Sequence, residues 1–188
     1  MPANLSLAAV AGTNCPKTAG VKELYTIPVG DINSITLGST HDITNIVFKV
    51  AGDGFGKINF KRGECEVTEA MERSNAVKVI FSVANPTKEQ RKSLTAIKNS
   101  CEQYMVARLY DQDTLLFVGY DEESLDEGFV AFESFASTSG KLKTDDNLFA
   151  MTMAAEQGEP LRVVSALTGA TATTTTQIVT ELVNATTV

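Results

Sequence analysis

The strongest concentration of ionisable side chains lies between Arg108 and Lys141, a stretch that has no lysine or arginine but eight acidic residues. Without those eight carboxylates the formal net charge of −7 would be +1. A run of like charges is usually a solvated loop, but it also suits a surface that faces a basic partner. We select part of this run as a candidate interaction site, the acidic loop: Asp121, Glu122, Glu123, Asp126 and Glu127.

A second charged group accompanies the one clear helical pattern in the chain. Thr87 and Gln90 form a capping box, which marks the start of a helix. One apolar stripe follows at helical spacing and predicts the face that packs on the core: Leu94, Ile97 and Cys101. The basic residues lie mostly off this stripe and predict a basic helix face: Lys88, Arg91, Lys92 and Lys98.

Residue patterns that would support catalysis or cofactor binding are weak. His41 is the single histidine, and no nucleophile motif accompanies it. The three cysteines are too widely spaced for a disulfide framework or a zinc site. The glycine-rich run at residues 52–56 is followed by a strand pattern and not by the helix that a phosphate-binding loop requires. The acidic runs lack the spacing of an EF-hand. We therefore expect no enzymatic activity, no cofactor and no metal.

Short alternating segments surround the helix. A hairpin is expected from residues 104–110 and 114–120, and a second from residues 42–50 and 57–61 around the glycine turn. Further strands are expected at residues 21–29, 32–37, 64–68, 76–83, 128–135, 148–155 and 160–167. So many short strands with one helix predict a mainly β fold, an antiparallel β-sandwich or barrel with one flanking α-helix.

The composition changes at both ends of this β domain. Residues 1–20 are small and turn-prone and predict an N-terminal arm, whereas residues 21–167 form the predicted domain. Residues 168–188 are rich in threonine and alanine, nearly uncharged and β-prone, so we expect a C-terminal arm that pairs with a neighbouring subunit. No signal peptide and no apolar run of about 20 residues is present, so a soluble protein without membrane contact is expected.

The order of these motifs resembles the tail tube and tail-ring proteins of tailed bacteriophages, in particular a divergent branch from phages of Bacteroides-type hosts, including the crAss-like phages. The resemblance covers about residues 15–165. It depends on Cys15 with residues 19–25, on residues 85–91 before the helix, on the hairpin segments 104–110 and 115–119, and on the final strands within 148–164.

The resemblance implies a tail-tube-like β-sandwich whose copies form a homo-oligomeric ring, six-fold or a multiple of it. The inner strands of such a ring merge into a barrel through which viral DNA passes without specific binding. The implied location is the tail or neck of a virion assembled in the host cytoplasm, with other tail or neck proteins as partners. The acidic loop would then lie at an inter-subunit contact or in the lumen. The threonine-rich tail and the acidic loop depart from the family pattern and leave room for a specialised ring.

We therefore expect a virion structural protein, a ring-forming tail tube or tail-ring subunit. The alternative is a β-sandwich adhesion or ligand-binding module on a virion or cell surface, with the acidic loop as its calcium or ligand site.

Overall fold

The computed structural model describes residues 20–39, 42–50, 53–71, 75–100, 102–110, 114–121, 129–139, 147–158, 160–165 and 178–179. The helical elements are α1 (Lys88–Asn99) and the short 3-10 helix η1 (Val29–Asp31). The strands are β1 (Val21–Pro28), β2 (Ile32–Leu37), β3 (Ile43–Phe48), β4 (Gly56–Ile58), β5 (Cys65–Met71), β6 (Asn75–Ala84), β7 (Gln103–Leu109), β8 (Leu115–Val118), β9 (Ala131–Thr138), β10 (Leu148–Gln157) and β11 (Arg162–Val163). The fold is thus mainly β with one α-helix, as the sequence predicts.

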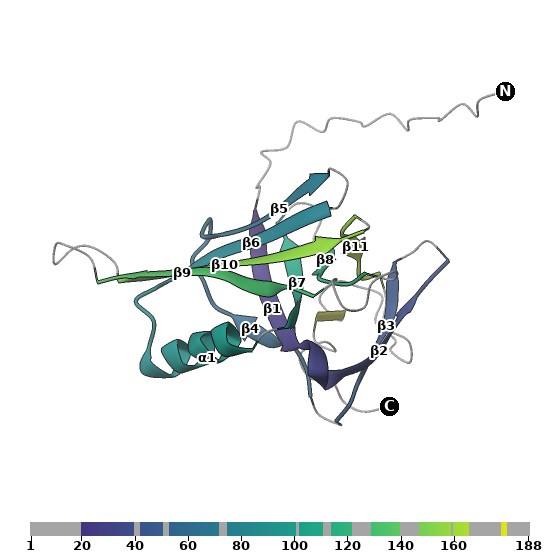
Figure 1. Cartoon of the computed structure of the whole chain (residues 1–188), viewed down its shortest axis with the longest axis horizontal. Helices are drawn as coiled ribbons and strands as arrows, with labels where there is room; N and C mark the ends of the chain where they lie inside the picture. Colours follow the sequence, from purple (N-terminus) through teal and green to yellow (C-terminus); the bar gives the residue numbers. More distant parts are fainter. Residues whose placement is uncertain are drawn as a thin grey trace.

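The described strands form three antiparallel sheets (Figure 1). Sheet A has the order β11-β8-β7-β1-β4, sheet B is the hairpin β2-β3, and sheet C has the order β5-β6-β10-β9. Sheets A and C pack face to face as the predicted sandwich, and sheet B lies on the other side of sheet A.

Sheet A separates two hydrophobic clusters because successive side chains of a strand point to opposite faces. Leu24 and Met105 face sheet C in the larger cluster, whereas Tyr25 and Val106 face sheet B in the smaller one. Strand β7 is consequently buried along almost its whole length. A strand buried on both faces has a nearly continuous apolar sequence, as residues 104–107 do.

Local signals fix the start of α1. Asn85 has a φ of 49°, a left-handed conformation that asparagine tolerates better than most residues, and it ends β6. The Thr87 side chain then accepts a hydrogen bond from the Gln90 N–H at 3.2 Å, and the Gln90 side chain accepts one from the Thr87 N–H at 2.8 Å. The predicted capping box is confirmed.

One predicted pairing is changed by the structure, whereas the predicted hairpin of residues 104–110 and 114–120 is confirmed as β7 and β8. The predicted hairpin of residues 42–50 and 57–61 is wrong, because β3 pairs with β2 and β4 pairs with β1. The Gly38 N–H donates to the Asp42 carbonyl oxygen at 2.8 Å, a bond between the chain after β2 and the chain before β3. The segment after β3 crosses to sheet A and buries Phe55 between Phe48 and Phe117.

The C-terminal arm has one described point of contact with the domain. Ile178 is buried in the cluster between sheets A and B, and Val179 packs against the same cluster. At Ile178 the arm therefore packs within its own chain, and its pairing with a neighbouring subunit stays a prediction. None of the helices in the described residues is long and apolar enough to cross a membrane.

Candidate assembly surface

Sheet C has one face in the core and one face open to solvent. In β6 and β10, Val79 and Phe81 pair with Met153 and Met151 on the buried face. The opposite face carries mostly small side chains from all four strands: Thr68, Ala70, Ala76, Ser82, Ala84, Ala131, Ser134, Ala136, Thr138, Ala150, Thr152 and Ala154. Ile80, which is exposed, and Leu148 are the large apolar side chains on this face.

The charged residues of the open face are mainly acidic. Glu66, Glu133 and Glu156 lie on it together with Lys78. The Lys78 ammonium is 2.8 Å from the Glu133 carboxylate, and both side chains are largely exposed. The open face thus consists mainly of small side chains, with Ile80 exposed among them, and carries a small net negative charge.

Among the described residues, β5 and β9 are the outer strands of sheet C and neither pairs with a further strand, although Val130, just before β9, pairs with Gln103 of β7. Strand β5 has seven residues and pairs with β6, and strand β9 has eight residues and pairs with β10. An edge strand exposes backbone N–H and C=O groups that can pair with another chain. Two edges of similar length on opposite sides of one sheet can join copies of the chain in series.

Helix α1 covers the end of the sandwich near β9 and β10 (Figure 1). Leu94 is buried in the larger cluster and Ile97 is half-buried against it. Cys101, the third residue of the predicted stripe, lies outside the described residues.

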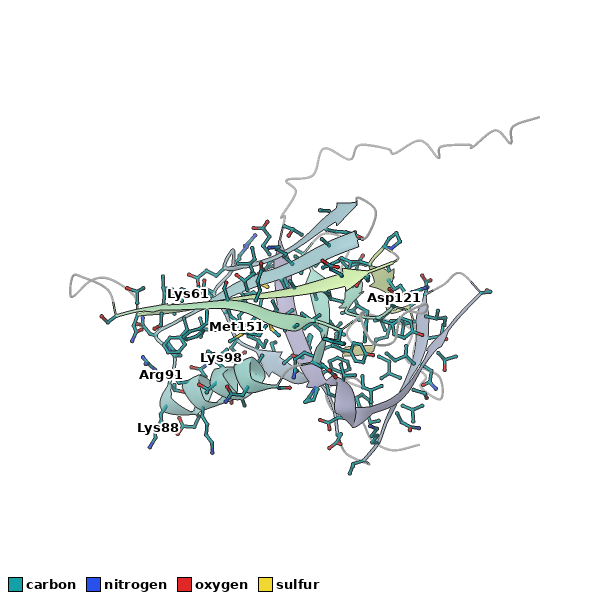
Figure 2. All side chains as sticks on the ribbon, viewed as in Figure 1. Lys61, Lys88, Arg91, Lys98, Asp121 and Met151 are labelled. Atoms are coloured by element: carbon teal, nitrogen blue, oxygen red, sulfur yellow. The ribbon has the colours of Figure 1, made fainter. Side chains whose placement is uncertain are left out.

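The structure divides the predicted basic helix face into two pairs. Lys88 and Lys92 are exposed. Arg91 and Lys98 instead point toward the aromatic side chains of β9 and β10 (Figure 2). The Arg91 guanidinium carbon is 4.7 Å from the ring centroid of Phe149.

Lys98 completes this contact between the helix and sheet C. Its ammonium nitrogen is 5.5 Å from the ring centroid of Phe135 and 5.7 Å from that of Phe132. Cations over aromatic faces are attracted by the ring quadrupole. Arg91 and Lys98 therefore fix α1 on the sandwich, which leaves Lys88 and Lys92 as the basic side chains of the predicted face that are free to meet a partner.

Only one residue of the acidic loop is described, and it is structural. Asp121 is buried, and its carboxylate accepts a hydrogen bond from the Gly158 N–H at 2.6 Å. This bond joins the end of β8 to the end of β10. The remaining four members, Glu122, Glu123, Asp126 and Glu127, lie outside the described residues, as does His41.

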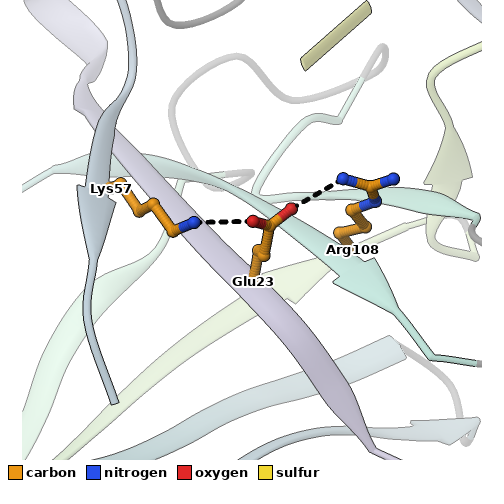
Figure 3. A network of polar contacts seen from close by, with 3 residues as sticks. All are labelled: Glu23, Lys57 and Arg108. Carbon is orange, nitrogen blue, oxygen red and sulfur yellow. Dashed lines mark hydrogen bonds and ion pairs between the residues drawn. The ribbon is translucent and has the colours of Figure 1, made fainter. Parts of the chain in front are cut away.

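A three-residue ionic network lies across sheet A (Figure 3). One carboxylate oxygen of Glu23 is 2.6 Å from the Lys57 ammonium, and the other is 2.8 Å from the Arg108 guanidinium. Burial by itself would raise the pKa of Glu23, but the hydrogen bonds from Lys57 and Arg108 outweigh it and lower this pKa to about 2. Glu23 therefore stays ionised near neutral pH and joins β4, β1 and β7.

The sequence prediction missed this network, since residues 23, 57 and 108 are far apart in the chain. A glutamate and an arginine within otherwise apolar strands were the available signal.

The Glu23 carboxylate and the Cys65 thiol both lie in structural surroundings. Both oxygens of Glu23 already accept bonds, and burial raises the pKa of the Cys65 thiol to about 12, which keeps it protonated. Among the described residues, no three metal-ligating side chains lie close enough to hold an ion. No protein-family model, curated protein or solved structure matches the chain. Sheet C, with its two outer edges and its open face of mostly small side chains, is thus the candidate functional surface.

Proposed function

We propose that the chain is a virion structural protein whose copies join through sheet C into a closed ring around a channel for DNA. The two open edges of sheet C support this proposal most strongly. The β9 edge of one copy pairs with the β5 edge of the next, so the interface is heterologous and the series closes by rotation. Closure removes exposed strand edges, which are otherwise sites of aggregation.

The open face of sheet C lines the channel in this proposal. Most of its side chains are small, and its glutamates repel the phosphates of passing DNA. The overall charge of −7 also disfavours tight binding of nucleic acid. The ring belongs to the tail tube or neck of a virion assembled in the host cytoplasm. Its symmetry, six-fold or a multiple of six, comes from the sequence resemblance alone.

The acidic loop and the helix supply a second contact between neighbours. Lys88 and Lys92 are exposed, and the acidic loop carries the opposite charge. Each exposed pair contributes about 0–1 kcal/mol, but the same contact repeats at every interface of a ring. The alternative function, a ligand-binding module with calcium in the acidic loop, is less well supported because the Asp121 carboxylate is buried and already bonded to Gly158.

Negative-stain electron microscopy of the purified full-length protein, together with mass photometry, tests the proposal. Rings of uniform diameter, and a mass that is a fixed multiple of the 20.1 kDa chain, are the expected result. A uniform monomer at micromolar concentration, both alone and with the other tail or neck proteins of the same virion, would argue against it.

A further inference from the structure

A groove of about 480 Å³ lies between α1 and β4, the edge strand of sheet A. Its apolar walls come from the helix, from β4 and from β6: Ile58, Val83, Leu94, Ala96 and Ile97. Proteins bind extended peptides by pairing their backbone with a free strand edge and placing alternate side chains in adjacent pockets. The α1–β4 groove offers both an edge and an apolar pocket.

The N-terminal arm contains a segment with matching chemistry. Residues 5–10 have the sequence Leu-Ser-Leu-Ala-Ala-Val and carry no charge. In an extended chain, Leu5 and Leu7 point to the same side. The C-terminal arm is a weaker match, because Ile178 is already buried on the other face of sheet A and Glu181 would bring a charge.

The position of Gly20 indicates which copy supplies the segment. The first described residue, Gly20, directly precedes β1, and Val21 at the start of β1 pairs with Leu109 (Figure 1). Thr26, near the other end of β1, lines the groove. To reach the groove of its own chain, the arm would have to reverse and run back along β1. Residues 10–20 span up to about 35 Å when extended, a length that suits docking on an adjacent copy beyond the Gly20 end of β1.

We propose that residues 5–10 of one copy add as a strand to β4 of a second copy, with Leu5 and Leu7 in the α1–β4 groove. This inference rests on the proposed ring assembly for the arrangement of the copies, and it names the contact that joins one ring to the next. Ser93 and Ala96 are exposed at the rim of the groove, so changes there alter the site without removing core packing.

Photo-cross-linking of the full-length chain tests the contact. Benzoylphenylalanine replaces Leu7, and equal amounts of ¹⁴N- and ¹⁵N-labelled protein are assembled together, irradiated and digested for mass spectrometry. We expect links from position 7 to residues 56–59 or 88–99 that join light and heavy chains. Links found only within chains of one isotope, or only to other segments, would overturn the proposal.

A matched pair of helix variants controls for specificity. Ala96→Arg fills the groove and should reduce the light–heavy links at least tenfold. Thr95→Arg places the same charge at the adjacent exposed position, which does not line the groove, and should change their yield less than twofold. Equal links in parent and Ala96→Arg would contradict docking in the groove.

Electron microscopy of the same samples separates this inference from the proposed function. If light–heavy links form at the groove but no rings are seen, the docking of residues 5–10 on a second copy stands and the proposed ring is wrong. Rings without such links would retain the proposed function and reject the docking of residues 5–10. If both proposals are correct, the parent protein forms stacked rings and the Ala96→Arg variant forms single rings without stacks.

Discussion

At the residue scale, the Glu23 network is the feature whose energetics can be measured most directly. Arg108 is buried, and its guanidinium reaches the Glu23 carboxylate at 2.8 Å. Removing the carboxylate charge would leave a buried cation without this partner, which costs more than the loss of the bond alone. The network is thus expected to stabilise the junction of β1, β4 and β7.

Glu23→Gln should lower the free energy of unfolding by about 1.5–3 kcal/mol, the usual range for a hydrogen bond to a charged group. Chemical denaturation followed by circular dichroism measures this difference. Glu133→Gln is the matched control, because it breaks the exposed ion pair with Lys78 and should cost about 1 kcal/mol or less. Equal effects of the two substitutions would show that the Glu23 network does not act as a buried ionic contact.

The same network predicts a pH dependence. The pKa of Glu23 is lowered from 4.5 to about 2 in the folded chain, so its contribution to stability is complete above about pH 4.5. It is lost as the pH falls from 4.5 toward 2, because the unfolded chain takes up the proton first. Across this window, Glu23→Gln should lose stability less steeply than the parent in denaturation series at fixed pH. Parallel curves would exclude the lowered pKa.

At the element scale, helix α1 shows which structural features the sequence predicts and which it does not. The capping box and the burial of Leu94 follow from neighbours three to seven residues apart, so they could be predicted. The position of Arg91 over Phe149 could not, since it depends on how β10 passes the helix. The pairing of β3 with β2 was missed for a similar reason, because the glycine run after β3 has the composition of a hairpin turn but serves as a crossover.

Arg91→Ala should expose the Phe149 ring that Arg91 covers. The free energy of unfolding should fall by about 1 kcal/mol, the usual contribution of a partly exposed cation–π pair with its packing. Lys92→Ala is the control, because Lys92 is the adjacent exposed residue of the same helix and should change the stability by about 0.5 kcal/mol or less. Thermal and urea unfolding give both values. The reverse order of the two effects would mean that Arg91 does not hold the helix.

At the scale of the whole molecule, charge and strand edges bear on assembly in different ways. Contacts between the acidic loop and exposed basic side chains weaken with salt, because the Debye length is only about 8 Å at 0.15 M. Backbone pairing between strand edges is much less sensitive to salt. The two contributions can therefore be separated by ionic strength.

Changing Glu122, Glu123, Asp126 and Glu127 together to Ser should lower the yield of rings at low salt while the monomer stays folded. Asp121 is left unchanged because it is bonded to Gly158 within the fold. Mass photometry at 0.05 and 0.5 M salt measures the yield, and the parent should lose rings with salt more steeply than the variant. The same yield for both proteins at both salt concentrations would exclude the acidic loop from the interface.

Hydrogen exchange at the edges of sheet C tests the central claim most directly. Full-length protein is compared at a concentration where rings form and after dilution to monomer, and exchange is followed by mass spectrometry. The proposed pairing of β9 with β5 of the next copy predicts slower exchange in the rings for peptides covering Cys65–Met71 and Ala131–Thr138. The inner strands β6 and β10, already paired on both sides, should exchange slowly in both states. Rings in which β5 and β9 exchange as fast as in the monomer would contradict assembly through sheet C.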